Sequence, residues 1–372
     1  MRELRPMRAV FSTIKDPRAA NARHQLFDVI FIALCATLAG CKTCFQFAVF
    51  AKSKEQFLGQ LLALEHGVPS HDTFSRVFRI LDPRAFEAAF RDFTSLFCQA
   101  LGKGTVVAFD GKAVRNAVAE GGRCSPLHLV NVWACDAKIA LAQFKAPNRN
   151  EVAGALEVLE MLSIAGTFVT ADALHCRPDI AQAILDKDAD YVLALKANRP
   201  KLLGAVKRRI EQASAPSHLQ QPTGRSHGRF ERRHITVVRA PRLADEYGFP
   251  GLRAVACIAT WRGKTKLPKN PTLKYFVLSR FVSAKRLAHI ARAHWGIENH
   301  LHWCLDVTFG EDSARTCLGN GPENLAILRK TALNMLHAHP AKMPLNHKIL
   351  RAGWQNEFLL EIFAHASKPR PA

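Results

Sequence analysis

The sequence has few acidic residues for its length. It holds 31 Asp and Glu against 52 Lys and Arg in 372 residues, which gives a formal net charge of +21. An excess of this size favours a polyanion as partner, with a merely basic, solvated surface as the alternative. Tyrosine is also scarce, with three in the chain, and a covalent tyrosine nucleophile is therefore not expected.

Long hydrophobic runs are missing as well. The longest strongly apolar run, Val29–Ala39, is shorter than the roughly 20 residues that a membrane-spanning helix needs, so a buried helix is expected. No apolar signal core follows the first residues, and we expect a cytoplasmic protein, nucleoid-associated in a bacterium. A hydrophobic content of 48% argues against general disorder, and the length suffices for two or three domains.

Cysteines do not occur in the pairs that a structural zinc site would need. Cys41 and Cys44 form one C-x-x-C motif, and no second pair lies at a fitting distance. A later helix offers other possible ligands, namely His294, His300, His302 and Cys304. We do not expect zinc at either place, and most cysteines resemble small core residues.

Three carboxylates stand in settings that suggest chemistry. Asp110 and Asp172 each follow an apolar run typical of a strand, and Glu298 lies in a helix-like segment. Two acids at strand ends and one on a helix can bind Mg²⁺, which prefers oxygen ligands. Two such ions about 3.5–4 Å apart stabilise both the attacking and the leaving oxygen in phosphodiester cleavage. Taken singly, each acid could be only a helix cap or a solvated residue.

The positive charge is concentrated in one region. Residues 199–292 contain 21 Lys and Arg and four acids, so 21 − 4 gives +17 of the total +21. This region lies between the second and third candidate acids. A basic insertion beside a metal site suits a protein that binds nucleic-acid backbone next to the bond it cuts.

Residues 1–100 are expected to form a small helical domain with a DNA-binding or partner-docking role. Helical patterns cover residues 26–40, 45–62 and 84–101, and Ser70 begins a further helix. No strand pattern appears. The basic stretch from Lys15 to Arg23 could contact phosphate or could be a solvated segment.

Residues 101–213 change to strands and helices. Strands are expected at 106–109, 127–135, 139–144, 167–171 and 191–195, and helices at 152–162, 178–185 and from 201 to 209. This β-β-β-α-β-α-β-α order is that of the ribonuclease-H fold. In that fold the first and fourth strands are neighbours, so Asp110 and Asp172 would meet.

A basic, mostly β insertion is expected at 214–283, with strand patterns at 229–239, 254–261 and 275–278. The core resumes at 284–340 with a helix over 284–305 that carries Glu298, followed by a final helix over 322–337. Asp306 lies eight residues after Glu298, near one face of a continued helix, and is the reserve third acid. Residues 341–372 form a basic tail with Trp354, Phe358 and Phe363 that is expected to pack on the surface.

Several longer motifs resemble one protein family. They are Asp-Gly-Lys at 110–112, Val-Thr-Ala-Asp-Ala-Leu-His-Cys at 169–176, Asp-Tyr-Val-Leu-Ala-Leu-Lys-Ala-Asn at 190–198 and His-Trp-Gly-Ile-Glu-Asn at 294–299. Segments 16–18, 69–75, 321–326 and 351–354 add to them. Over roughly residues 10–360 the chain resembles the DDE insertion-sequence transposases of the ISAs type, which include the H-repeat-associated proteins. The resemblance implies an α/β fold: a ribonuclease-H-like mixed-sheet core with a mostly β insertion, preceded by a small all-helical N-terminal domain.

The resemblance also implies a function. A transposase of this type binds the terminal inverted repeats of double-stranded DNA, cuts at the element ends and transfers the freed 3′-hydroxyl ends to target DNA. Asp110, Asp172 and Glu298 would be the catalytic triad and would hold two Mg²⁺ or Mn²⁺ ions, with Asp110 shared by both. Pairing two DNA ends implies at least a homodimer in the working complex, and no membrane is involved.

The surroundings of Glu298 depart from the pattern of related transposases, which place a Tyr, an Arg and a Lys around the Glu. Ala291, His294 and Leu305 occupy those positions here, and Arg292 is a neighbouring replacement for the Arg. The residues expected near scissile or flanking phosphates are Lys112, Arg115, Lys196, Asn198 and Arg292, and Trp295 could stack on a displaced base. Helix packing is the competing role for Trp295.

Two other functions stay open. A different ribonuclease-H-like nuclease, such as a junction resolvase, would share the acids without needing the basic insertion or the N-terminal domain. A catalytically inactive, transposase-derived DNA-binding protein would fit the altered surroundings of Glu298.

Overall fold

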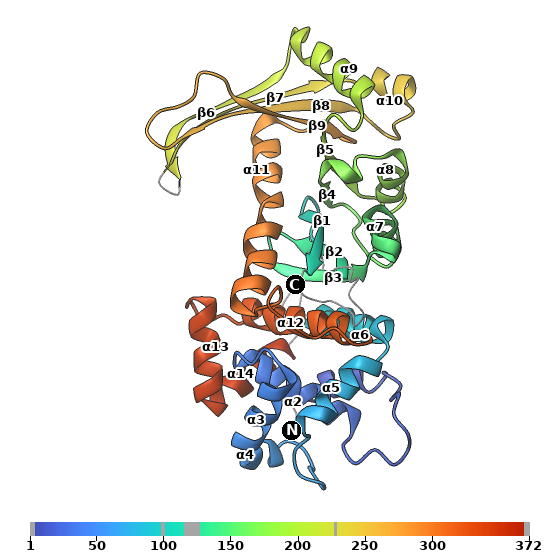
Figure 1. The fold of residues 1–372 in the computed structure, drawn as a ribbon. Helices are drawn as coiled ribbons and strands as arrows, with labels where there is room; N and C mark the ends of the chain where they lie inside the picture. The colour runs from blue at the N-terminus through green and yellow to red at the C-terminus, as the bar shows by residue number, and fades with distance from the viewer. Residues whose placement is uncertain (1–3, 98–100, 115–126, 227–228, 368–372) are drawn as a thin grey trace.

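The computed structural model describes residues 4–97, 101–114, 127–226 and 229–367. Its strands are β1 (Val106–Val114), β2 (Leu127–Ala134), β3 (Ile139–Lys145), β4 (Phe168–Ala171), β5 (Asp190–Leu195), β6 (Ser217–Ser226), β7 (Arg229–Arg239), β8 (Ala254–Gly263) and β9 (Thr272–Leu278). They form one nine-stranded sheet in the order β3-β2-β1-β4-β5-β9-β8-β7-β6. Figure 1 shows this sheet in the upper part of the molecule, above a layer of helices.

The first five strands form a ribonuclease-H-like core, as the sequence predicts. β1 pairs in parallel with β4, from Val106 opposite Phe168 to Phe109 opposite Ala171. β4 pairs in parallel with β5, whereas β2 and β3 continue the sheet in antiparallel fashion. All four residues of β4 are buried, which is typical of a parallel strand covered on both faces.

The predicted β insertion extends the core sheet and does not form a sheet of its own. β9 pairs with β5 in antiparallel fashion, and β8, β7 and β6 follow in turn. Beyond the core these strands project to one side as a curved ribbon (Figure 1). The sequence analysis did not find β6, because Ser217–Ser226 is polar and has no apolar alternation.

Helices cover both faces of the sheet. One face carries α7 (Glu151–Glu160), α8 (Pro178–Leu185), α9 (Pro200–Glu211) and α10 (Arg242–Tyr247), and the other carries α11 (Ala284–His294). α7 begins where the sequence predicts, because the Asn150 side chain accepts a hydrogen bond from the backbone N–H of Ala153. The two apolar clusters beside the sheet hold β1 and β4 in place at the candidate acids.

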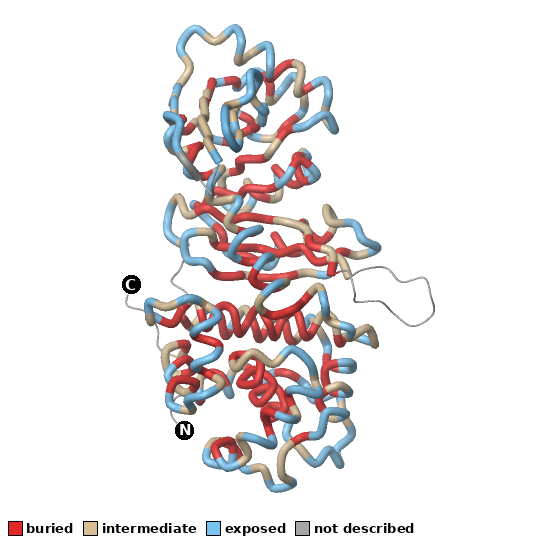
Figure 2. Tube along the Cα trace, turned by 60° about the vertical axis from the view of Figure 1, so that its left-hand side comes forward, coloured by how far each residue is buried: buried red, intermediate tan, exposed pale blue. Residues whose placement is uncertain are grey.

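The lower helices are α1 (Arg5–Phe11), α2 (Leu26–Leu38), α3 (Cys44–Ser53), α4 (Glu55–Gly59), α5 (His71–Ile80), α6 (Pro83–Phe97), α12 (Gly321–Ala338), α13 (Leu345–Trp354) and α14 (Asn356–Ala366). All residues of α2 are buried. α12 crosses between the lower helices and the sheet, and its buried course is visible in Figure 2. The Asn334 side chain bonds both backbone groups of Ala140 in β3, and Asn324 donates to the Phe78 and Leu81 carbonyls.

The C-terminal segment is part of the main core, so the prediction that it packs on the surface is wrong. Phe358 and Phe363 are fully buried, and the Phe363 ring lies 5.0 Å from that of Phe31 in α2. Trp354 alone of the three aromatic residues is exposed, at 75%. The apolar side chains of α14 all meet the N-terminal helices because they follow helical spacing.

Across the described ranges, no helix combines the length and the apolar character needed to cross a membrane.

Candidate active site

Asp110 lies within β1, whereas the sequence analysis placed it at a strand end. The ladder with β2 continues past it to Val114. The parallel partner β4 stops at Ala171, opposite Phe109, and Asp172 follows directly. The two acids therefore meet where β4 ends, which is the juxtaposition predicted from the strand order.

The candidate acids influence one another electrostatically. Burial, followed by the charges of Asp172 and Glu298, raises the pKa of Asp110 to about 7, while His294 acts in the opposite direction. Like charges in a partly dry site disfavour ionisation. The structure thus brings all three predicted acids into one electrostatic cluster.

His294, the last residue of α11, orients Asp172. Its Nδ1 lies 2.9 Å from Thr170 Oγ1, and its Nε2 lies 3.6 Å from Asp172 Oδ1. The contact with His294 lowers the pKa of Asp172 against the effect of burial, and Lys196 adds to the decrease. Asp172 is therefore held ionised by the histidine that occupies the position of the family's arginine.

Glu298 lies in an irregular helical segment. The predicted continuous helix over 284–305 is wrong, because α11 ends at His294 and two π-helical stretches follow, Ile297–His302 (η4) and Cys304–Thr308 (η5). Single π-helical turns are frequent at functional sites. Glu298 is exposed at the start of η4. In the same stretch, His302 Nδ1 lies 3.5 Å from Asp110 Oδ2.

Lys112 points into the protein. Its side chain is 7% exposed, and Nζ pairs with Asp306 and, at 2.5 Å, with Glu311 Oε2. Burial opposes the charge of Lys112, but the two carboxylates outweigh it and raise its pKa. This placement supports neither the phosphate contact expected of Lys112 nor the reserve metal-ligand role of Asp306. Spacing of eight residues failed as a guide because the α-helix does not continue.

The other expected contact residues lie around the acids. Lys196 and Asn198 are exposed after β5, and Asn198 Nδ2 donates to the Ala173 carbonyl at 2.7 Å, which fixes the turn after Asp172. Arg292 is exposed on α11. Arg115 lies outside the described residues.

Trp295 is 44% exposed, so the competing role in helix packing is wrong. Lys274 Nζ of β9 lies 4.1 Å from the centroid of the Trp295 ring, a cation–π contact. Burial lowers the pKa of Lys274, while Asp172 acts in the opposite direction. Lys274 and Arg233 extend the basic surroundings of the acids, and neither was singled out because both are one of many cations in basic strands.

The sequence analysis also did not single out Glu151 and His175. Glu151 opens α7 and adds to the charge that raises the pKa of Asp110. His175 is buried in the short 3₁₀ turn Ala173–His175 that follows Asp172. The only sequence signals were an acid directly after a helix cap and a histidine within the motif around Asp172.

The donor chemistry of the cluster fits a hard divalent cation. Asp110, Asp172 and Glu298 supply carboxylate oxygens, and a cation would offset the repulsion that raises the pKa of Asp110. In the part of the chain that the structure describes, no three His, Cys, Asp or Glu side chains are close enough together to hold an ion. The residues therefore match a cation in type and charge, and binding would draw the side chains together.

Comparison with known proteins settles the family. The family model described as "Transposase DDE domain" matches residues 101–335, which is 235 of 372 residues. The chain belongs to the DDE transposase family. A second model, described as "DDE_Tnp_1-associated", matches residues 8–94, the N-terminal helices of this DDE family member.

Named relatives agree with this family. "Putative transposase YncI" of Escherichia coli O157:H7 is 33% identical over 336 residues, covering 87% of this chain and 85% of the relative. "H repeat-associated putative transposase YhhI" of Escherichia coli K12 is 29% identical, covering 97% of this chain and 98% of the relative. "Uncharacterized protein in dhlA 3'region" of Xanthobacter autotrophicus is 37% identical, covering 68% of this chain and 87% of the relative.

Proposed function

We propose that this chain is the transposase of a bacterial insertion sequence that binds the terminal inverted repeats of its element. It cuts the phosphodiester bonds at the element ends and transfers the 3′-hydroxyl ends to target DNA. The observation that carries the proposal is the joint effect of Asp172 and Glu298 on the pKa of Asp110. Three acids distant in sequence thus meet beside a strongly basic sheet extension.

Asp110, Asp172 and Glu298 would hold two Mg²⁺ or Mn²⁺ ions, which when bound stabilise charge on the attacking and leaving oxygens. His294 keeps Asp172 ionised and in place through Thr170. His302 lies against Asp110. The histidines of this chain thus orient two of the three acids from the helical side of the sheet.

Cations beside the acids would bind the DNA backbone. Lys196, Lys274 and Asp172 influence one another electrostatically, and Arg233 and Arg292 extend the positive surface. Trp295 and Asn198 complete the predicted contacts, the first by stacking and the second by holding the turn after Asp172. Neutralised phosphates would make the affinity fall steeply with salt.

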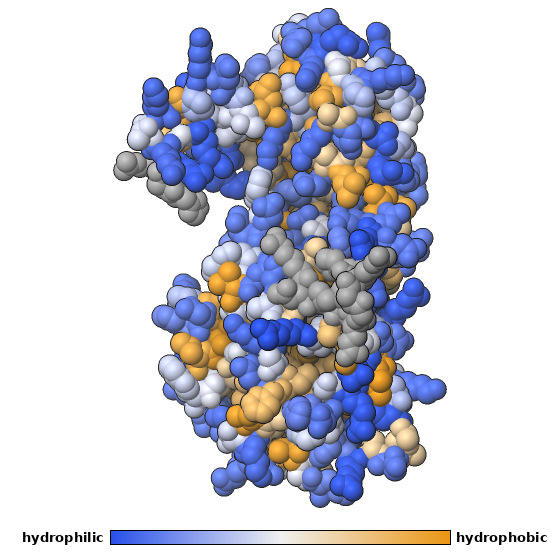
Figure 3. Space-filling model, in the orientation of Figure 1, coloured by the Kyte–Doolittle hydropathy of each residue, from blue (hydrophilic) through white to orange (hydrophobic). Residues whose placement is uncertain are grey.

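The overall shape suits a duplex. Figure 3 shows the molecule hollowed beneath the projecting end of the extended sheet, with hydrophilic side chains along the projection. α11 runs beside this hollow (Figure 1). A groove of about 710 Å³ in the N-terminal helices is lined by Arg18, Arg23 and Arg76 and would bind further backbone phosphates.

Pairing two element ends calls for at least two copies of the chain in the DNA complex. The proposed site of action is the bacterial nucleoid in the cytoplasm.

The decisive experiment uses purified full-length protein, a DNA fragment with the flanks of its own gene, and Mg²⁺ or Mn²⁺. Asp172→Ala and a chelator control are run in parallel. We expect strand cuts at the ends of the inverted repeats that disappear in both controls.

Two outcomes would favour the other functions. Binding to the repeats without any metal-dependent cut would favour an inactive, transposase-derived DNA-binding protein. Metal-dependent cutting without preference for the repeats would favour a general ribonuclease-H-like nuclease or resolvase.

A further inference from the structure

A fourth carboxylate lies against the strand that carries Asp110. A Cβ atom at Gly111 would lie 2.2 Å from Glu151 Oε2 and 2.8 Å from Glu151 Oε1. The Glu151 carboxylate therefore occupies the space of the side chain that Gly111 lacks. Any other residue at position 111 would displace it from the backbone next to Asp110.

Glu151 is held there but remains reachable by solvent. It is the first residue of α7, where the helix dipole favours a negative charge. Its side chain is 23% exposed, and Oε1 lies 3.5 Å from His128 Nδ1 of β2. Glu151 also contributes to the rise in the pKa of Asp110, so the two carboxylates are near neighbours.

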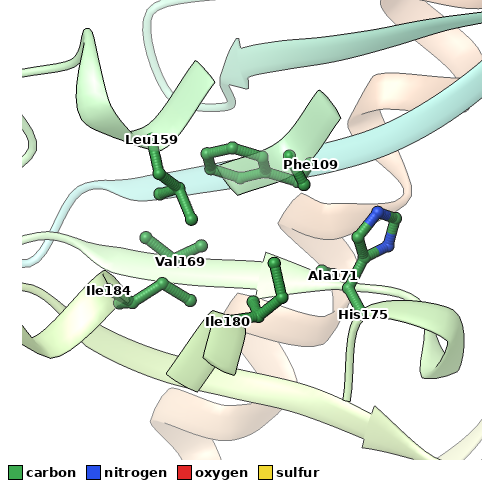
Figure 4. A pocket seen from close by; sticks show the side chains of 8 residues that line it. Phe109, Leu159, Val169, Ala171, His175, Ile180 and Ile184 are labelled. Carbon is green, nitrogen blue, oxygen red and sulfur yellow. The ribbon is translucent and has the colours of Figure 1, made fainter. Parts of the chain in front are cut away.

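His175 gives an independent indication of a ligand at this position. It is 1% exposed, and among the described residues neither ring nitrogen reaches a partner with normal hydrogen-bond geometry. Burial lowers the pKa of His175, against the pull of the Glu151 and Asp172 carboxylates. Figure 4 shows the ring at one end of a small apolar cavity, next to Ala171, where β4 ends.

A buried imidazole without partners is costly, because an unmade hydrogen bond in a dry site is not compensated. The apolar side of the cavity, formed by residues such as Phe109 and Ile180, offers it none. The polar neighbours are the two acids. A hydrated cation between these acids would supply the missing partner through one of its waters.

We propose that Glu151 is a fourth carboxylate of the divalent-cation site, binding from the α7 side of the sheet the cation that Asp110 binds from the α11 side. His175 is its positioning residue. This inference rests on the proposed metal-dependent function. It extends the ligand set from three acids to four and explains why position 111 has no side chain.

The test measures Mn²⁺ binding by the full chain with a DNA fragment present, by electron paramagnetic resonance of free Mn²⁺. We expect Glu151→Gln to weaken Mn²⁺ affinity about tenfold or more, as loss of groups around a metal commonly does. Gly111→Ala should weaken it too, because the added Cβ displaces an unchanged Glu151. The matched control is Glu160→Gln, an exposed acid at the end of the same helix.

Thermal unfolding in chelator verifies that each variant is folded. The inference is overturned if Glu151→Gln and Gly111→Ala bind Mn²⁺ as tightly as the parent chain while Asp110→Asn does not. If the parent chain itself binds no Mn²⁺, the proposed metal-dependent function fails together with the inference, and the Asp110→Asn comparison separates the two cases.

Discussion

At the scale of single residues, the acids differ because their surroundings differ. Asp172 has a histidine partner and a lowered pKa, whereas Asp110 is surrounded by burial and like charge and has a pKa raised to about 7. Such a pair is adapted to hold a cation between unequal carboxylates. The difference is measurable without any substrate.

The raised pKa of Asp110 predicts a pH-dependent stability. The folded chain binds this proton more tightly than the unfolded chain, so the free energy of unfolding falls as pH rises from about 4 to about 7. A shift of about three pKa units corresponds to at most about 4 kcal/mol. In chelator, Asp110→Asn should therefore raise the unfolding midpoint in urea at pH 8 and leave it unchanged below pH 4. An equal gain at both pH values would contradict this origin.

The sequence predicted Asp110 and Asp172 as neighbours because strand order alone determines which strands pair. It could not predict the role of Lys112. That side chain pairs with Asp306 and Glu311, which lie almost 200 positions away, and a basic residue next to an acid looks the same whether it faces solvent or core. Glu151 was missed for the same reason, since its importance appears only in contact with Gly111.

At the scale of elements, the ion pairs of Lys112 attach β1 to the segment that follows Glu298. Asp306 belongs to η5, and Glu311 lies in the turn beyond it. Glu311 is fully buried, and Lys330 and Arg329 of α12 are its other cations. The π-helical segment is thus fixed to the catalytic strand by charge as well as by packing.

Removal of this attachment has a predictable effect. Lys112→Met leaves Glu311 buried with fewer cations, which commonly destabilises a fold by about 3–5 kcal/mol. We expect a clear drop in the urea midpoint followed by circular dichroism. Lys285→Met, at an exposed position of α11, is the matched control and should change little. Equal effects of the two substitutions would show that the buried pairs contribute nothing specific.

Element boundaries show where sequence patterns end. Pro178–Leu185 and Arg229–Arg239 were predicted with the bounds that the structure has, because proline at a helix start and strict alternation are strong signals. The π-helical stretches were not predictable, since no residue pattern distinguishes them from an α-helix.

At the scale of the whole molecule, the two ends of the chain share one core. α14 packs Phe358, Leu359 and Phe363 among the N-terminal helices, and α12 connects this core to the sheet. The region of residues 1–100 is therefore built partly from the C-terminal segment. Sequence order could not indicate this, because it gives no distance between segments more than 250 residues apart.

Phe363→Ala should consequently destabilise the N-terminal helices. Loss of a fully buried phenylalanine costs about 3–5 kcal/mol through lost burial and the cavity that remains. The matched control is Trp354→Ala, at a side chain that is 75% exposed. Limited proteolysis should cut the Phe363→Ala variant within residues 1–100 well before the control. Equal proteolysis of both variants would contradict a shared core.

The continuous sheet has a consequence for where DNA is cut. From β4, which Asp172 follows, to the outermost strand β6 there are five strand-to-strand steps, joined throughout by backbone hydrogen bonds. At about 4.8 Å per step this spans roughly 24 Å, without a flexible linker. For the proposed transposase, the distance between the bound backbone and the cleaved bond is then a fixed length. The position of the cut along the DNA would be set by the number of strands in the sheet.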